Sequence, residues 1–182
     1  MGTVSDGIEK ILFTEAQIQE KVSDLAKQVT EKFSGKVAKD NPLLCICILK
    51  GAFVFTADMV RQMNLPLELD FIRLSSYKKG TDGGKVDLLM DMKSEIEGRH
   101  VLVLEDIIDT GSTLAYLKEL LEKRRAAGIS FCVLVDKTPR RKKALKLDFV
   151  GFKLEKDEFV AGYGLDYAEK YRNLPHIGAL KR

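Results

Sequence analysis

The chain has 182 residues, of which 45% are hydrophobic and 31% charged, and its formal net charge is +3. This length fits one domain that buries about two-thirds or more of its unfolded surface, so we expect a single domain over residues 1–182. The small net charge gives no argument for a nucleic-acid partner, and no apolar stretch reaches the roughly 20 residues that span a bilayer. Because no secretory apolar region opens the chain, the sequence predicts a soluble, cytoplasmic protein.

The first strong helix signal begins at Thr14. Thr14 and Gln17 have the spacing of a capping box, and apolar residues then recur at helical spacing, which predicts a helix over about 14–33. Leu43–Leu49 is a short, continuous apolar run and predicts a fully buried strand. A helical stretch then extends to about Met63.

The next part of the chain predicts two strands around an open loop. Leu67–Leu74 and Lys85–Met92 are strand candidates that can pair with each other. Between them, Ser75–Lys85 contains three glycines and has no apolar periodicity, so we expect a loop there.

Strands and helices continue to alternate in the second half. His100–Leu104 and Ile129–Val135 predict buried strands, and Ser112–Ala127 predicts a helix that ends at Gly128. A polar loop over Asp136–Lys146 and several short strand-like segments follow. Three continuous apolar strands that alternate with helices predict an α/β fold, with a mostly parallel sheet and helices on both faces.

The cysteines and histidines give no sign of a metal site. Cys45, Cys47 and Cys132 lie in apolar runs without a nearby cluster of His or Cys, so we interpret them as buried, reduced thiols. His100 and His176 are far apart in sequence, and we interpret each as structural or exposed.

The most informative motif is Val101–Thr113, VLVLEDIIDTGST. An apolar strand leads into Glu105 and Asp106, and Asp109 opens a turn of small residues before a helix. Open α/β sheets bind ligands at the carboxyl ends of their strands, and a helix N-terminus favours phosphate. Since acids alone would repel a phosphate, the motif suggests a phosphorylated ligand that brings a divalent cation. On spacing alone, an acidic loop with a purely structural role is the alternative.

This motif resembles the signature of the type I phosphoribosyltransferases, which bind phosphoribosyl pyrophosphate. Further segments are similar to the same family, in order along the chain; they are Leu49–Gly51, Ser76–Tyr77, Asp136–Arg141, Asp157–Tyr167 and Tyr171–Pro175. The segments that begin at Asp136 and Asp157 resemble the purine pocket of the members that use 6-oxopurines. The resemblance extends from Ile11 to Lys181.

The resemblance implies both a fold and a reaction. The fold is a mostly parallel, twisted sheet flanked by helices, with a mobile lid over about 75–85 and a small hood made by the N- and C-terminal segments, of which about 153–182 bind the purine. The reaction is purine salvage, in which the 5-phosphoribosyl group moves from phosphoribosyl pyrophosphate to N9 of hypoxanthine or guanine, giving IMP or GMP and pyrophosphate. A mobile lid suits this reaction, because a reactive ribosyl cation must be kept from water.

The resemblance also implies partners. Mg²⁺ is the expected cofactor, the substrates are small molecules, and a homodimer or homotetramer is expected without a nucleic-acid or membrane partner. It leaves hypoxanthine, guanine and xanthine unranked, because the contacts to the C2 edge of the purine are mostly made by the backbone.

Residue roles follow from the same resemblance. Asp109 is the expected general acid/base at purine N7. Glu105 and Asp106 are expected to hold the ribose hydroxyls and the adjoining metal shell, and Asp166 is expected to bind a second metal ion. The residues expected to bind the 5′-phosphate are Asp109, Thr110, Gly111, Ser112 and Thr113. Those expected to bind pyrophosphate are Lys50, Gly51 and Arg172; those expected in the lid are Ser76 and Tyr77. The purine is expected to contact Lys137 at O6, Phe159 by stacking, and Val160 and Asp166 at its C2 edge. In the family the peptide bond before the lysine that matches Lys50 is often cis.

Two other functions are compatible with parts of this pattern. A regulator with the same fold would sense phosphoribosyl pyrophosphate and bind RNA, DNA or protein, but Asp109 and Lys137 are both present and the net charge is modest, which favours an enzyme. A phosphoribosyltransferase for a 6-aminopurine would not be expected to carry the segment around Lys137. We interpret the basic run Arg140–Lys143 as a solvated loop, and Phe159 by residue type alone as a core residue.

Overall fold

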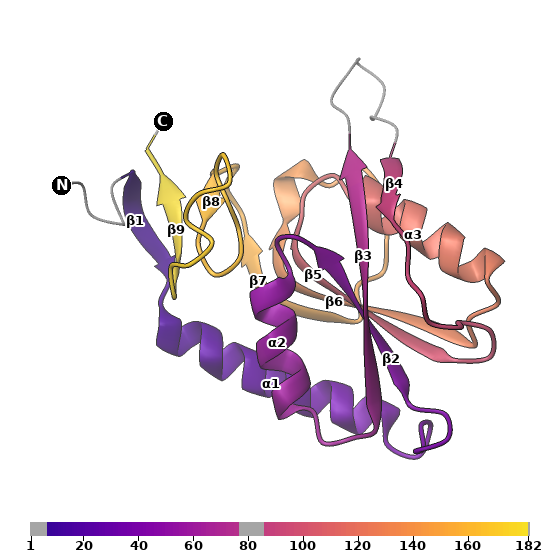
Figure 1. The fold of residues 1–182 in the computed structure, drawn as a ribbon. Helices are drawn as coiled ribbons and strands as arrows, with labels where there is room; N and C mark the ends of the chain where they lie inside the picture. Colours follow the sequence, from indigo (N-terminus) through magenta and orange to yellow (C-terminus); the bar gives the residue numbers. More distant parts are fainter. Residues whose placement is uncertain (1–6, 77–85, 182) are drawn as a thin grey trace.

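The computed structural model describes residues 7–76 and 86–181, and its main layer is a six-stranded sheet (Figure 1). The strands have the spatial order β4-β3-β2-β5-β6-β7, and all neighbours run parallel except β4, which is antiparallel to β3. Their bounds are β2 Leu43–Leu49, β3 Leu67–Ser76, β4 Val86–Met90, β5 His100–Ile108, β6 Gly128–Lys137 and β7 Phe149–Leu154. The predicted, mostly parallel sheet is confirmed.

Helices cover both faces of this sheet, as the sequence predicts. α1 (Glu15–Phe33) and α2 (Phe53–Gln62) lie together on one face, and α3 (Ser112–Lys123) lies on the other, over β3 and β4 (Figure 1). Thr14 caps α1, because its side chain accepts a hydrogen bond from the backbone of Gln17 while the Gln17 side chain accepts one from the backbone of Thr14. The capping box read from the sequence is therefore formed.

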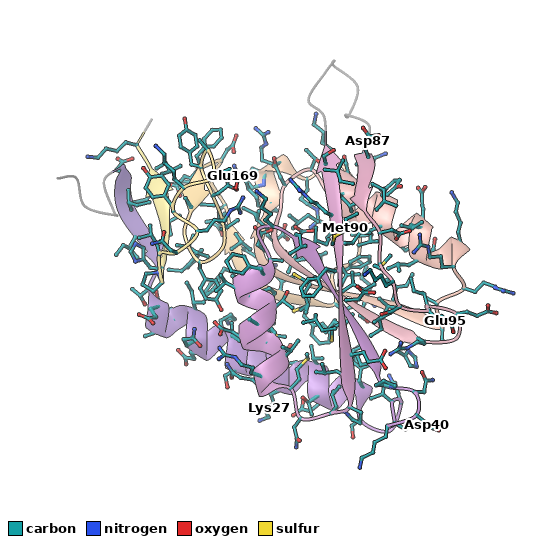
Figure 2. All side chains as sticks on the ribbon, viewed as in Figure 1. Lys27, Asp40, Asp87, Met90, Glu95 and Glu169 are labelled. Atoms are coloured by element: carbon teal, nitrogen blue, oxygen red, sulfur yellow. The ribbon has the colours of Figure 1, made fainter. Side chains whose placement is uncertain are left out.

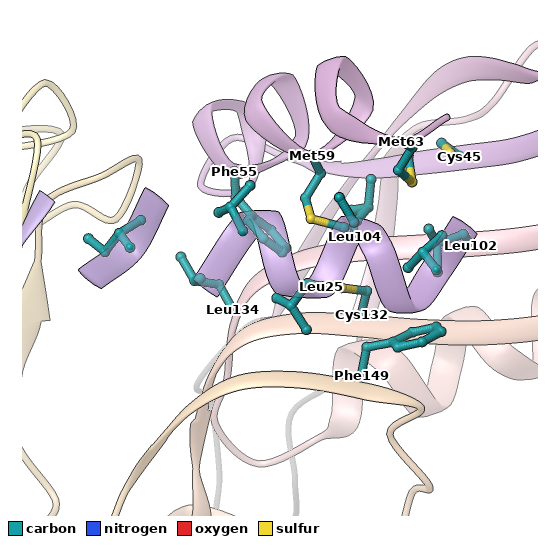
Figure 3. Packing of buried hydrophobic residues seen from close by; sticks show 14 of the residues in the cluster. Leu25, Cys45, Phe55, Met59, Met63, Leu102, Leu104, Cys132, Leu134 and Phe149 are labelled. Atoms are coloured by element: carbon teal, nitrogen blue, oxygen red, sulfur yellow. The ribbon is translucent and has the colours of Figure 1, made fainter. Parts of the chain in front are cut away.

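The two faces explain why the central strands are continuous apolar runs. Successive side chains of a strand point to opposite faces. On β5, Leu102 and Leu104 pack into the core beneath α1 and α2, which Figure 3 shows from close by, whereas Val101 and Val103 pack into the core beneath α3. With both faces buried, no polar residue interrupts the run, and the alternation cannot be seen in the sequence.

A small second sheet stands beyond β7 and joins the two ends of the chain. It consists of β1 (Ile8–Phe13), β9 (Ile177–Leu180) and β8 (Val160–Ala161), in that spatial order and antiparallel (Figure 1). Phe13 stacks on Phe152 of β7 with 4.0 Å between the ring centroids, which ties this sheet to the main one. We call this small sheet, together with the loop 162–176, the hood.

Two strands extend further than their apolar runs predict. β5 continues to Ile108, so Glu105 and Asp106 lie inside the strand and not in a loop after it. β6 continues to Lys137 and is followed by a 3₁₀ turn over Thr138–Arg140, where the sequence predicts only a polar loop. The reason is pairing: Ile108 of β5 lies opposite Asp136 of β6, so each strand extends the other past the point where its side chains become polar.

The helix α3 is shorter than predicted, and the predicted role of Gly128 is wrong. The helix ends at Lys123, and Arg125 takes the left-handed conformation, with φ 59°, that glycine usually supplies at this place. The backbone N–H of Ala127 then bonds the carbonyl of Arg99, and Gly128 is the first residue of β6. Sequence periodicity alone does not show that the backbone of Ala127 leaves the helix and pairs with Arg99.

The structure also bears on the predictions for the cysteines, for the lid and for membrane-spanning helices. The three cysteines are free and buried, and burial raises the pKa of Cys45 to about 12, so these thiols stay protonated. β3 and β4 pair as expected on either side of the predicted lid. Ser75 and Ser76, expected in the loop, belong to β3, and residues 77–85, including Tyr77, fall outside the described residues. Among the helices that the structure describes, none is long and apolar enough to cross a membrane.

Candidate active site at the carboxyl ends of the strands

Most of the residues predicted for the site gather at one edge of the main sheet. The parallel strands β2, β5 and β6 all end there, and the hood lies beside that edge (Figure 1). Direct contacts join the segments: Lys50 after β2 pairs with Glu169 of the hood, and Asp109 after β5 pairs with Arg140 after β6. The site is thus built from four chain segments that meet only in the folded protein.

Two acids are buried at the end of β5. Glu105 and Asp106 are only 9% and 7% exposed. Burial raises the pKa of both carboxyl groups, and the charge of Asp106 raises that of Glu105 further. Asp106 accepts a hydrogen bond from the backbone of Ile107 at 2.9 Å, whereas Oε2 of Glu105 is buried without a hydrogen-bond partner in the described part of the chain. Such a pair favours a nearby cation.

Glycines allow the loop after β2 to lie directly on these acids. A Cβ atom on Gly51 would overlap the carboxylate of Asp106, and one on Gly164 would overlap the carbonyl oxygen of Gly51. Gly164 also has φ 96°, which L side chains rarely adopt. The peptide bond between Leu49 and Lys50 is cis. The close approach of the loop after β2 to Asp106, and of the hood to that loop, thus leaves no room for a side chain at Gly51 or Gly164.

The turn between β5 and α3 forms an anion cradle. Gly111 is the N-cap residue of α3, has φ 84° and makes no side-chain cap. The N–H of Ser112 makes only a long hydrogen bond, 3.4 Å, to the hydroxyl oxygen of Thr110, so the first turn of the helix can still present N–H groups to an anion. The helix dipole favours negative charge there. The hydroxyl of Thr110 donates to that of Ser112 at 3.1 Å, and the carbonyl of Thr110 accepts from the backbone of Lys142 at 3.0 Å, which fixes the turn from behind.

Alternating acids and bases line the side of the site next to β6. Arg140 donates from Nε to Asp109 Oδ1 at 3.0 Å and from Nη1 to Asp157 Oδ2 at 3.2 Å. The other oxygen of Asp157 lies 2.6 Å from Nζ of Lys137, which also sits 5.3 Å from the centre of the Phe159 ring. Phe159 is 55% exposed, so it is not a core residue. An exposed aromatic ring beside a cation can hold a flat polar ring.

The interpretation of the basic run Arg140–Lys143 as a solvated loop is wrong for its two arginines. Arg140 makes the contacts above, and Arg141 donates to Asp136 at 3.1 Å and to the carbonyl of Leu145 at 2.8 Å. The sequence gives only a weak signal for Arg140. The signal is its position three residues after Lys137, inside a segment that resembles the family.

On the opposite side, the hood places its own acids against the predicted pyrophosphate binders. Glu169, labelled in Figure 2 on the hood loop, lies 3.1 Å from Lys50 and 3.1 Å from Arg172. Arg172 also pairs with Asp166 at 2.8 Å and donates to the carbonyl of Gly164 at 2.8 Å. Hydrogen bonds from Lys50 and then Arg172 lower the pKa of Glu169. Sequence analysis missed Glu169.

The carboxylates expected to bind metal lie in two separate groups. Within residues 7–76 and 86–181, no group of three or more His, Cys, Asp or Glu side chains lies close enough to hold a metal ion. Asp166 instead pairs with Arg172, while Glu105 and Asp106 form the buried pair. Carboxylate oxygens with an unpartnered lone pair still suit a hard divalent cation such as Mg²⁺.

Of the other residues predicted for the site, those that the structure describes lie at the ends of strands or in the first turn of α3. Val160 begins β8 beside Phe159, and Thr113 lies in the first turn of α3. Ser76 is the last residue of β3, and Tyr77 is outside the described ranges.

Comparison with known proteins gives a consistent result. The family described as phosphoribosyl transferase domain matches residues 11–168. The chain is 47% identical over 175 residues to the hypoxanthine-guanine phosphoribosyltransferase of Bacillus subtilis (strain 168), which covers 96% of this chain and 94% of that protein. A hypoxanthine phosphoribosyltransferase from Staphylococcus aureus has 41% identity and a TM-score of 0.90, covering 100% and 96% of the two chains. One from Trypanosoma cruzi, solved as a ternary substrates complex, has 41% identity and a TM-score of 0.91, covering 97% of both chains.

Proposed function

Because the chain belongs to the phosphoribosyl transferase domain family, we propose that it is a purine salvage enzyme, a hypoxanthine-guanine phosphoribosyltransferase. It transfers the 5-phosphoribosyl group of phosphoribosyl pyrophosphate to N9 of hypoxanthine and of guanine. The observation that supports this most is one sheet edge with three kinds of subsite: buried acids, an anion cradle, and a buried lysine beside an exposed aromatic ring. A ribosyl phosphate and a flat 6-oxopurine need these together.

The purine is recognised by the ammonium group of Lys137 and by the aromatic ring of Phe159. Lys137 donates a hydrogen bond to O6, which favours a 6-oxopurine over a 6-aminopurine, because an amino group cannot accept that bond in the same way. Phe159 stacks on the purine, and the backbone of Val160 and Asp166 meets its C2 edge. Asp109 acts as the general acid/base for the proton at N7, and it is also the first residue of the turn that holds the 5′-phosphate.

On the ribose side, charge is the main argument. Positive charge develops on the ribose ring as pyrophosphate leaves, and the acids Glu105 and Asp106 stabilise it where it appears. The N–H groups and hydroxyls from Asp109 to Thr113 hold the 5′-phosphate. Mg²⁺ would be held by carboxylates among Glu105, Asp106 and Asp166, and would supply neutralisation of pyrophosphate charge.

The leaving group is assigned to the loop after β2 and to the hood. Lys50, the backbone of Gly51, and Arg172 bind pyrophosphate, so the contacts of Glu169 with Lys50 and Arg172 must break when pyrophosphate binds.

We also propose one phosphoribosyltransferase domain over 1–182 that acts in the cytoplasm as a homodimer or homotetramer, without a nucleic-acid or membrane partner. Ser76 and Tyr77 would belong to a lid over the bound substrates.

One assay tests the proposed function. Purified protein is incubated with phosphoribosyl pyrophosphate and hypoxanthine, guanine, xanthine or adenine, with Mg²⁺ or with a chelator. We expect IMP and GMP to form only with Mg²⁺, and no AMP. If no 6-oxopurine yields a nucleotide, the enzyme assignment is wrong, and a regulator that senses phosphoribosyl pyrophosphate becomes the better reading.

A further inference from the structure

We propose that Arg140 and Asp157 are positioning residues, which hold Asp109 and Lys137 in one row that matches the N7–O6 edge of a 6-oxopurine. The inference rests on the proposed function and adds two residues to it. N7 and O6 lie side by side on one edge of the purine ring. An acid that handles the N7 proton and a cation that binds O6 must therefore stand at a fixed spacing.

The backbone sets this spacing only coarsely. Ile108 and Asp136 lie opposite each other in the pairing of β5 with β6, so the next residues, Asp109 and Lys137, start from adjacent places at the sheet edge. Asp109 is already outside β5, whereas Lys137 is the last residue of β6 and lies opposite Leu154 of β7; backbone pairing fixes neither side chain. Their charged ends need other partners to stay in one place.

Arg140 and Asp157 supply these partners as an alternating row of charges. Arg140 lies between Asp109 at 3.0 Å and Asp157 at 3.2 Å, and Asp157 lies between Arg140 and Lys137 at 2.6 Å. Arg140 occupies only Oδ1 of Asp109, so Oδ2 remains for substrate. The hydrogen bond from Lys137, followed by that from Arg140, lowers the pKa of Asp157, which keeps this link of the row ionised.

The residue types fit this task. A guanidinium presents its N–H groups in a rigid planar fork, so Arg140 can bind two carboxylates at a set angle, whereas a lysine ammonium on a flexible stem cannot. Lys137 is 8% exposed at its side chain, whereas the side chains of Arg140 and Asp157 are 39% and 41% exposed. Such exposed pairs add little to folding stability, so a loss of activity in their variants reports on positioning.

The experiment compares four variants of the full-length protein in IMP formation. Arg140→Met breaks the row, Arg140→Lys keeps the charge without the fork, and Asp157→Asn removes the central acid. Arg124→Met is the matched control, because Arg124 makes a comparable pair with Asp91, at 2.9 and 2.6 Å, at the far end of α3. Thermal unfolding of each variant checks the fold.

We expect Arg140→Met to lower kcat about 10- to 100-fold, the scale of a misplaced catalytic group, with KM for phosphoribosyl pyrophosphate changed by less than about twofold. Arg140→Lys should recover part of that loss. Asp157→Asn should raise KM for hypoxanthine about tenfold, as expected when a charge-assisted hydrogen bond no longer holds Lys137. The Arg124→Met control should match the wild type in kcat and KM.

Several outcomes would overturn the inference. Wild-type kcat in Arg140→Met, a loss no larger than that of Arg124→Met, or a gain in activity would each remove Arg140 from the row. An unchanged KM for hypoxanthine in Asp157→Asn would show that Asp157 does not position Lys137. If Arg140→Met fails to fold, Arg140→Lys and Asp157→Asn still decide the matter. A wild-type protein that makes no nucleotide would instead refute the proposed function, which is a distinguishable result.

Discussion

The acids at the end of β5 and the acids at the rim of the site are placed in opposite environments. Glu105 and Asp106 are buried, make no ion pair with a lysine or arginine of the described chain, and have pKa values raised chiefly by burial. At the rim, Asp157 contacts Lys137 and Arg140, while Glu169 contacts Lys50 and Arg172, and the pKa of each of these acids is lowered.

The difference shows how one small site can accept both a cation and several anions. The buried pair is destabilised by its own charge and gains most from a positive partner. The rim already balances its charges, so pyrophosphate must replace the carboxylate of Glu169 beside Lys50 and Arg172. We therefore expect substitutions of the buried pair to change stability and cation binding, and substitutions at the rim to change turnover and ligand affinity.

The largest expected effect is at Asp109, which accepts a hydrogen bond from Arg140 of the rim. Asp109→Asn should lower turnover by about 10²-fold or more, because the amide cannot take the N7 proton. Binding of phosphoribosyl pyrophosphate should remain largely intact and can be measured by calorimetry. Full activity in this variant would remove Asp109 from the mechanism.

The next effect concerns the choice of base. Lys137→Met should raise KM for hypoxanthine by about tenfold or more, since a charge-assisted hydrogen bond to O6 is lost from a buried position. KM for phosphoribosyl pyrophosphate should stay near that of the wild type. Equal effects on both KM values would argue that Lys137 supports the whole site and does not read O6.

The buried pair gives a prediction about stability. Glu105→Gln should stabilise the metal-free protein by about 1 kcal/mol near neutral pH, because it removes a buried carboxyl group whose ionisation is opposed by burial and by the charge of Asp106. The same variant should bind phosphoribosyl pyrophosphate with Mg²⁺ more weakly. Chemical denaturation with a chelator measures the first effect, and Glu97→Gln, an exposed glutamate far from the site, is the control.

This stability effect has a defined pH dependence. The folded state keeps the proton of Glu105 at pH values where the unfolded chain, with its pKa near 4.5, has lost it. Stability of the wild type therefore falls as pH rises from about 4.5 through the raised pKa of the folded state. The gap in free energy of unfolding between Glu105→Gln and the wild type should widen over that range; a gap that stays constant, or narrows, would contradict the raised pKa.

The smallest expected effect lies on the pyrophosphate side of the rim. Glu169→Gln should lower KM for phosphoribosyl pyrophosphate and the inhibition constant of pyrophosphate about two- to fivefold, since exposed ion pairs are weak. Glu122→Gln, which loses a comparable exposed pair with Lys118, is a suitable control in the same inhibition assay. A higher KM in Glu169→Gln would show that Glu169 assists binding and does not compete with the ligand.

The local signals in the sequence predicted much of the fold. The capping box at Thr14, the buried strand Leu43–Leu49 and the pairing of the strands around the lid are all confirmed. Each depends on neighbours a few residues away, through helical periodicity, turn residues or an unbroken apolar run. The ends of β5, β6 and α3 were less well predicted, because they depend on backbone partners from other elements.

The sequence by itself determined the order of the elements and the motifs that carry the resemblance, since these are properties of neighbouring residues. Only the tertiary structure decided which charges meet. Arg140 reaches Asp109 across 31 positions of sequence, and Glu169 of the hood lies between Arg172 and Lys50, the residue that follows β2. The energy of a charge pair depends on distance and burial, and neither quantity exists until the chain has folded.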